Sequence, residues 1–160
     1  MRAFLDHASV SPLRPEAAAA MAELLGLAQA DPGRAYEEAL VVRELIEEAR
    51  RQVAGLARSS ARQLIFTSSI AESITTAIAG LADGGRIYAP ATERQSTLDA
   101  ARRFGELVEI RVDREGRVDL AELDELLAAA PGLVCCQLAN HETGVLVDPA
   151  ALVELARRRS

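Results

Sequence analysis

The chain has 160 residues, 49% hydrophobic and 26% charged, and its 18 basic and 24 acidic side chains give a formal net charge of −6. This length and apolar content suit one domain with a core and exclude a disordered acidic tail. The negative charge excludes a nucleic-acid binder that works by neutralising phosphates. No apolar run approaches the roughly 20 residues of a membrane span, and the N-terminus has no apolar signal core. We therefore expect a cytoplasmic protein that binds neither nucleic acid nor membrane.

Two features of the composition narrow the chemistry. The cysteines are the adjacent pair Cys135 and Cys136, which cannot staple a fold and lie in an apolar run. Every basic side chain is an arginine, and the sequence contains no lysine. No side chain of this chain can therefore form a Schiff base with an aldehyde cofactor.

Helical and strand-like patterns alternate along the chain. Four apolar runs predict strands, at 63–66, 86–89, 107–112 and 133–138. Helices are predicted from Pro15 to about Ala28 and over 35–57, 71–82, 93–104 and 119–130, with a last one from Asp148-Pro149. Asp119, with Glu122 three residues later, is a plausible capping box.

Strands separated by helices predict an α/β fold with a partial, mostly parallel sheet flanked by helices. The alternation stops after about four strands, so the sheet is expected to be incomplete, with an open edge that needs a partner. No internal repeat, linker or domain boundary is evident, so residues 1–160 are expected to form one portion of a single domain. The basic run 157–159 is expected to meet the negative end of a helix dipole rather than nucleic acid.

Three loops that follow predicted strands carry polar residues. In parallel α/β sheets, ligands bind at the carboxyl ends of strands, beside helix N-termini. In the first loop, 67–72, hydroxyl groups and free helix amides could hold a phosphate. The alternative is that one serine simply caps the helix, since the loop has no glycine for close backbone approach.

The other two loops offer a cation and a set of donors and acceptors. Arg94, in loop 92–96, can stack on a planar ring or pair with an anion, or it is an exposed arginine at a helix start. In loop 139–144, Asn140, His141 and Glu142 stand in a row. No second histidine lies at metal-ligand spacing, so no metal site is expected there.

In this order, the motifs resemble those of the cysteine desulfurases, within the class V aminotransferase group of fold-type I pyridoxal phosphate enzymes. The collinear segments are Phe4–Ala8 with Ser11–Pro15, Asp31–Arg34, 47–54, Ile65–Ser68 with Glu72, Asp113–Asp119 and Gln137–Gly144. The resemblance covers essentially the whole chain, and it is specific because many modest motifs occur in order at the right separations. It implies the N-terminal portion of the large domain of such an enzyme, with pyridoxal 5′-phosphate as cofactor.

The resemblance also implies which residues contact that cofactor. Relatives bind its phosphate with a glycine and a threonine in the turn that is filled here by Ser69, Ile70 and Ala71, so only backbone amides remain. Arg94 stands where relatives stack a histidine on the pyridine ring. His141, with Asn140 just before it, occupies the place of the asparagine that bonds the ring hydroxyl.

The rest of the family's machinery is expected beyond Ser160. In relatives, an aspartate pairs with the pyridine nitrogen, a lysine holds the cofactor covalently, and a mobile cysteine takes sulfur from L-cysteine and leaves alanine. Cys135 and Cys136, expected inside a strand, are not assigned that nucleophilic role. We therefore expect this chain alone to be inactive, and to act as a fragment or split subunit that forms a homodimer or pairs with a complementing C-terminal half.

The sequence leaves three other functional hypotheses open. A class V aminotransferase or lyase with other chemistry would explain the departures at Ile70, Ala71 and Arg94. A non-catalytic, degenerate half would bind or regulate a full-length relative. A small flavodoxin-like phosphate binder is the weakest reading because it leaves the collinear motifs unexplained.

Overall fold

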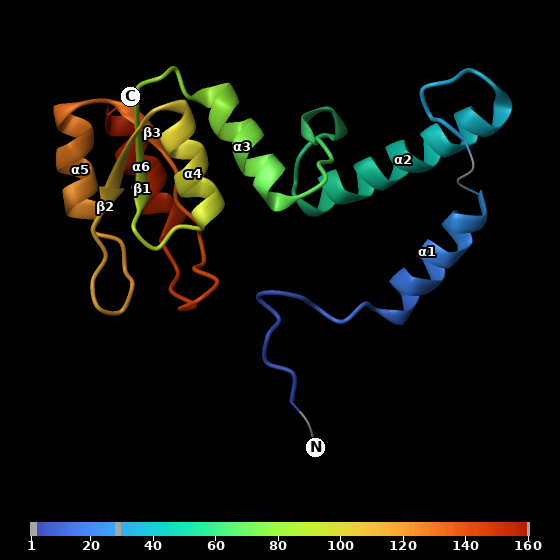
Figure 1. The fold of residues 1–160 in the computed structure, drawn as a ribbon, viewed down its shortest axis with the longest axis horizontal. Helices are drawn as coiled ribbons and strands as arrows, with labels where there is room; N and C mark the ends of the chain where they lie inside the picture. The colour runs from blue at the N-terminus through green and yellow to red at the C-terminus, as the bar shows by residue number, and fades with distance from the viewer. Residues whose placement is uncertain (1–2, 28–29, 160) are drawn as a thin grey trace. The chain divides into compact units, whose positions relative to one another are not determined.

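The computed structural model describes residues 3–27 and 30–159 (Figure 1). It contains two compact units, Met1–Phe66 and Thr67–Ser160, which are described separately here. None of the described helices combines the length and the apolar content that crossing a bilayer requires. The assignment of all 160 residues to a portion of one domain stays a prediction.

The first unit consists of helix α1 (Pro15–Leu27), helix α2 (Glu37–Leu56) and the short 3-10 helix η1 (Ala61–Gln63). The predicted end of α1 at Ala28 lies outside the described residues. Helix α2 carries two glutamates in its first turn and ends in a left-handed residue, Arg58, with φ 51°. The amide of Ser59 bonds the carbonyl of Ala54, and the amide of Arg58 bonds that of Gly55, which is the Schellman arrangement for ending a helix.

The predicted strand over 63–66 is wrong. Its first residue ends η1, and the rest of the segment is extended but pairs with no strand among the described residues. Arg50 of α2 contacts this segment instead. Its Nη1 donates to the carbonyl oxygen of Leu64 over 2.8 Å, and its guanidinium lies 4.9 Å from the centre of the Phe66 ring. Ile65 is 75% exposed. The apolar run is therefore tied to a helix rather than buried in a sheet.

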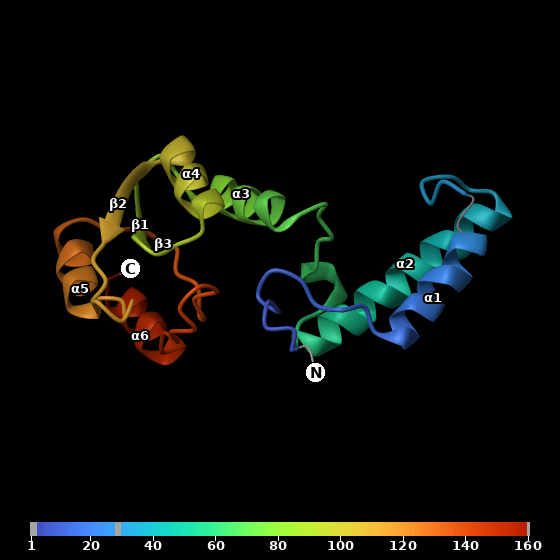
Figure 2. The ribbon, with the colours of Figure 1, turned by 60° about the horizontal axis from the view of Figure 1, so that its bottom comes forward.

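The second unit is built on a parallel three-stranded sheet (Figure 2). Its strands are β1 (Arg86–Pro90), β2 (Glu106–Ile110) and β3 (Gly132–Val134), in the order β2-β1-β3. The helices are α3 (Ile70–Leu81), α4 (Gln95–Phe104), α5 (Leu120–Ala129) and α6 (Pro149–Arg159). The predicted α/β class, with an incomplete parallel sheet flanked by helices, is confirmed.

Helices cover both faces of this sheet, since consecutive strand residues point to opposite sides. Ile87 packs with Ile78 of α3 and Ala101 of α4 in one core cluster. The next residue, Tyr88, packs with Leu123 of α5 and Leu155 of α6 in the other cluster. Figure 2 shows α3 and α4 on one side of the strands and α5 and α6 on the other.

Strand β3 is shorter than the predicted run 133–138. One further ladder bond, from the amide of Cys135 to the carbonyl oxygen of Tyr88 over 2.8 Å, follows its last residue. The chain then leaves the sheet. Cys135 and Cys136 consequently lie after the strand and are half-buried, rather than inside the strand at core positions as the sequence predicted.

Helices α5 and α6 begin where the sequence predicted. Asp119 accepts a hydrogen bond from the amide of Glu122 over 2.9 Å at the start of α5. The Glu122 carboxylate does not complete a capping box but accepts from the backbone and side chain of Arg111, at 2.7 and 2.8 Å. Helix α6 begins at Pro149, as predicted, and the predicted basic run falls in its last residues. The Arg159 side chain lies outside the described part of the chain.

Candidate functional site

The loops after the strands meet at one end of the sheet in the second unit. A hollow of about 350 Å³ is lined by one face of α3, by the start of α4 and by the segment after β3. A second hollow, of about 450 Å³, lies between residues 92–96 and the pair His141 and Glu142. Arg94 lines both hollows. The second and third loops thus lie together at the carboxyl edge shared by β1 and β3, and the first loop, which follows no strand, contributes Ile70 to the first hollow.

The first loop is organised by its own side chains. Ser69 caps α3 by accepting from the amide of Glu72 over 3.2 Å. The Glu72 carboxylate accepts from the backbone amide and the hydroxyl of Ser68, both at 2.6 Å, and these hydrogen bonds lower the pKa of Glu72. The amides of Ile70 and Ala71 have no acceptor among the described residues, as expected for the first residues of a helix. Ser69 therefore caps α3 and still leaves the amides of Ile70 and Ala71 free.

The second loop presents a cation. Arg94 is the N-cap residue of α4, and its side chain is only partly exposed. Within the described part of the chain, its guanidinium forms no hydrogen bond or ion pair. An arginine that lines two hollows with no protein partner is available to stack on a ring or to pair with an anion.

In the third loop, the adjacent residues Asn140 and His141 have different surroundings. The buried Asn140 uses its amide on the protein, because Nδ2 donates to the carbonyl oxygen of Thr92 over 3.0 Å and Oδ1 accepts from the amides of Glu142 and Thr143, both at 2.9 Å. His141 lines the second hollow, and its Nε2 lies 3.3 Å from a Glu142 carboxylate oxygen. The Nδ1 atom of His141 is buried with no hydrogen-bond partner among the described residues.

Sequence reasoning missed the contacts that join the second and third loops. Glu93 Oε1 accepts from the amide of Gln137 over 2.5 Å, and Gln137 Nε2 donates to the carbonyl oxygen of Thr92 over 3.1 Å. These partners are 44 and 45 residues apart in sequence. No local spacing signals such a pair. The only sequence hint was the position of Glu93 directly before Arg94.

The two thiols share the first hollow with Glu93. Burial, reinforced by the nearby negative charge of Glu93, raises the pKa of Cys135, and the same causes raise the pKa of Cys136 from 9.0 to about 11. Because the thiolate is the reactive form of cysteine, both side chains are poor nucleophiles at neutral pH. In the described residues, no group of three or more His, Cys, Asp or Glu side chains is placed to hold a metal ion.

The fold and the site together define a class of protein. A parallel sheet covered on both faces, with polar loops gathered at its carboxyl edge beside a helix start, is the architecture of α/β ligand-binding domains. The model of the family named "Aminotransferase class-V" matches residues 3–160. The chain belongs to this family.

Similar proteins include cysteine desulfurases. One from Frankia sp. (strain EuIK1) is 34% identical, and the match covers 96% of this chain and 41% of that protein. Cysteine desulfurase IscS from Vibrio cholerae is 30% identical, over 98% of this chain and 42% of that protein. The chain thus spans about two fifths of the length of these curated relatives.

Solved structures agree on the fold. A NifS-like protein from Rickettsia africae ESF-5 has a TM-score of 0.85 and 26% identity, and the match covers 97% of this chain and 44% of that one. Another structure, titled "NIFS-LIKE PROTEIN", has a TM-score of 0.85 at 21% identity, over 100% of this chain and 46% of that one.

Proposed function

We propose that this chain forms one side of a pyridoxal 5′-phosphate site in a cysteine desulfurase-type protein. The observation that carries the proposal is the meeting of the second and third loops at one sheet edge, with Arg94 between two hollows and His141 in one of them. The hollow volumes fall in the range of roughly 300–1,000 Å³ that is usual for small-molecule sites. The desulfurase relatives support the choice of cofactor and substrate class.

The residues present suit the cofactor's phosphate and ring. The unpaired amides of Ile70 and Ala71, at the positive end of α3, would hold the phosphate beside Ser69. Arg94 would lie against the ring face. His141, which lines the second hollow, would bond the ring hydroxyl. Asn140 would hold this loop in place through the backbone contacts described above.

The site as described is incomplete for chemistry. When bound, pyridoxal phosphate supplies an electron sink that stabilises negative charge on a substrate carbon. The sequence has no lysine to hold the aldehyde. A guanidinium group is a poor proton shuttle, so Arg94 would orient the cofactor rather than move protons. Cys135 and Cys136 do not supply the sulfur-accepting thiolate, because burial keeps both protonated.

We therefore propose that a lysine and a nucleophilic cysteine from a segment outside these 160 residues complete the site. That segment belongs to the same polypeptide, to a complementing C-terminal half, or to a second copy of the protein. In the completed protein, sulfur passes from L-cysteine to the enzyme cysteine and alanine is released. The cytoplasmic location stays a prediction.

Two measurements test this function. Calorimetric titration of the 160-residue chain with pyridoxal phosphate should show binding that dialysis reverses, and both Arg94→Ala and His141→Ala should weaken it. L-cysteine with the cofactor should yield alanine only after addition of the C-terminal part of a desulfurase relative. Absence of cofactor binding in both the chain alone and the mixture would contradict the proposal, and alanine production by the chain alone would contradict the assignment of the chemistry to an outside segment.

A further inference from the structure

The carboxylate of Glu93 joins the two polar loops across the end of the sheet. Its Oε1 accepts the amide of Gln137 over 2.5 Å, and its Oε2 accepts the amide of Arg94 over 3.3 Å. One side chain therefore bonds the backbone on both sides of the site. A hydrogen bond to a charged acceptor is worth about twice a neutral one, so the contact with Gln137 is a strong link.

Two further bonds reinforce this link from the other direction. The carbonyl oxygen of Thr92 accepts from Gln137 Nε2 over 3.1 Å and from Asn140 Nδ2 over 3.0 Å. Residues 92 and 93 are thereby bonded to residues 137 and 140 by three hydrogen bonds. We call these three bonds the loop clamp. The only connection between these loops along the chain runs through more than 40 residues, so the clamp fixes their separation directly.

Arg94 depends on this clamp for its position. It follows Glu93 immediately and is the N-cap residue of α4, and its guanidinium has no partner among the described residues. The clamp fixes the backbone from which this long side chain extends. We propose that Glu93 is a positioning residue, which locks the loop that carries Arg94 to the segment after β3 and so holds Arg94 between the two hollows.

The charge of Glu93 has a second consequence in the first hollow. The titratable groups that line it are Glu93, Arg94, Cys135 and Cys136. Glu93 adds to the burial that keeps both thiols protonated. The residue that aligns the loop thus also adds to the effect of burial on the pKa of both thiols. In the proposed sulfur-transfer protein, they would not compete with the cysteine that accepts sulfur.

Two substitutions separate hydrogen bonding from charge. Glu93→Gln keeps a carbonyl oxygen for the Gln137 amide but removes the charge, whereas Glu93→Ala removes both. Glu142→Gln is the matched control, because it removes a carboxylate that lines the second hollow and does not bond Gln137. The first measurement is amide hydrogen exchange of Gln137 by NMR in the 160-residue chain. The second is the pH profile of the reaction of the two cysteines with a disulfide reagent.

The Gln137 amide should exchange at least about tenfold faster in Glu93→Ala, which corresponds to about 1.4 kcal/mol of lost protection, and within about threefold of the original rate in Glu93→Gln. In Glu93→Gln, the thiols should react at lower pH than in the unchanged chain, but still above the ordinary pKa of 9.0, because burial remains. Glu142→Gln should change neither readout. If Glu93→Ala does not fold, Glu93→Asp, one methylene shorter, should show the same loss of protection.

Unchanged Gln137 exchange in the alanine or aspartate variant, or an unchanged thiol profile in Glu93→Gln, would overturn the inference. Neither readout needs a ligand, although the role of Arg94 toward the cofactor rests on the proposed function. A chain that fails to bind pyridoxal phosphate but shows the expected exchange would therefore contradict the proposed function and leave the loop clamp supported. A chain that binds pyridoxal phosphate but shows unchanged Gln137 exchange in Glu93→Ala would support the proposed function and contradict the loop clamp.

Discussion

The Asn140 side chain donates to the carbonyl oxygen of Thr92 over 3.0 Å while its own carbonyl oxygen accepts the amides of Glu142 and Thr143. Asn140 is only 8% exposed, so water cannot replace these bonds at little cost. The side chain of the adjacent His141 bonds no backbone group in the described part of the chain, and its Nε2 lies 3.3 Å from a Glu142 carboxylate oxygen. Two neighbouring polar residues thus serve different purposes, one structural and one available to a ligand.

Asn140→Ala should lower the free energy of unfolding of the second unit by about 2–3 kcal/mol, because it removes one of the two donors to the Thr92 carbonyl oxygen and leaves the amides of Glu142 and Thr143 without this acceptor. His141→Ala is the matched control and should change it by less than about 1 kcal/mol. Urea unfolding followed by circular dichroism measures both. Equal losses in the two variants would refute the division of roles.

The hydroxyl group of Tyr88 closes the end of α5. Tyr88 is completely buried, and its hydroxyl donates toward the carbonyl oxygens of Ala130 at 2.7 Å and Leu126 at 3.2 Å. Tyr88→Phe keeps the ring in the core but removes this donor, so it should cost about 1–2 kcal/mol. The comparison variant is Tyr36→Phe, since Tyr36 is 49% exposed and accepts one bond of 3.3 Å from the amide of Asp31. It should change the unfolding free energy by less than about 0.5 kcal/mol, and a larger effect there than at Tyr88 would count against this assignment.

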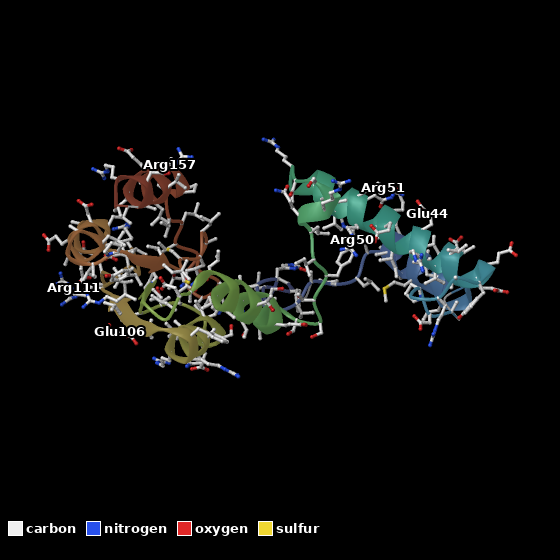
Figure 3. All side chains as sticks on the ribbon, turned by 90° about the horizontal axis from the view of Figure 1, so that it is seen from above. Glu44, Arg50, Arg51, Glu106, Arg111 and Arg157 are labelled. Carbon is white, nitrogen blue, oxygen red and sulfur yellow. The ribbon has the colours of Figure 1, made fainter. Side chains whose placement is uncertain are left out.

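Neighbouring arginines on α2 should differ in their effect on the first unit (Figure 3). Arg50 bonds the carbonyl oxygen of Leu64 and lies over the Phe66 ring, whereas Arg51 pairs on the surface with Glu44 and Glu48 at 2.6 and 2.8 Å. Arg50→Ala should destabilise the unit by about 1–2 kcal/mol, because it removes a charged hydrogen bond and a cation–π contact.

Arg51→Ala should have a much smaller effect, because exposed ion pairs contribute little and salt screens them. Thermal unfolding of both variants at low and high salt provides the comparison. A salt-dependent loss in Arg51→Ala that exceeded the loss in Arg50→Ala would contradict the structure.

Alkaline pH should destabilise the second unit through Cys136. Its thiol has a pKa of about 11 in the folded chain, against 9.0 in the absence of burial. Between these values the unfolded chain releases the proton first, so unfolding becomes more favourable as pH rises from about 9 to about 11. Below pH 9 both states are protonated and the stability is fully retained. Cys136→Ala should therefore lose less stability than the unchanged chain between pH 8 and 11 in urea titrations, and parallel losses would rule out this cause.

Much of the helical structure could be predicted from the sequence because its signals are local. Pro149 after Asp148, and Asp119 three residues before Glu122, mark helix starts that the structure retains. The strands at 86–89 and 107–112 were predicted within a few residues, since each pairs along most of an apolar run. Two of the three candidate loops were also predictable, because they follow strands whose carboxyl ends share one edge, whereas loop 67–72 follows a segment that joins no sheet.

The apolar runs 63–66 and 133–138 show where local patterns fail. Both have the composition of a strand, but a strand also needs a partner at the correct distance. Arg50 provides a different partner for the first run, and Glu93 draws the backbone of Gln137 out of the sheet at the end of the second. These partners lie 14 and 44 residues away along the chain.

The sequence by itself determined the α/β class, the helix boundaries and the family resemblance, because these depend on periodicity, capping residues and motif order. Only the tertiary structure decided that Asn140 is committed to the backbone, that His141 and Arg94 are left without strong partners, and that Glu93 joins their loops. The physical reason is that these contacts connect segments distant in sequence. Their distances are set by how the sheet and its covering helices pack, which no local pattern encodes.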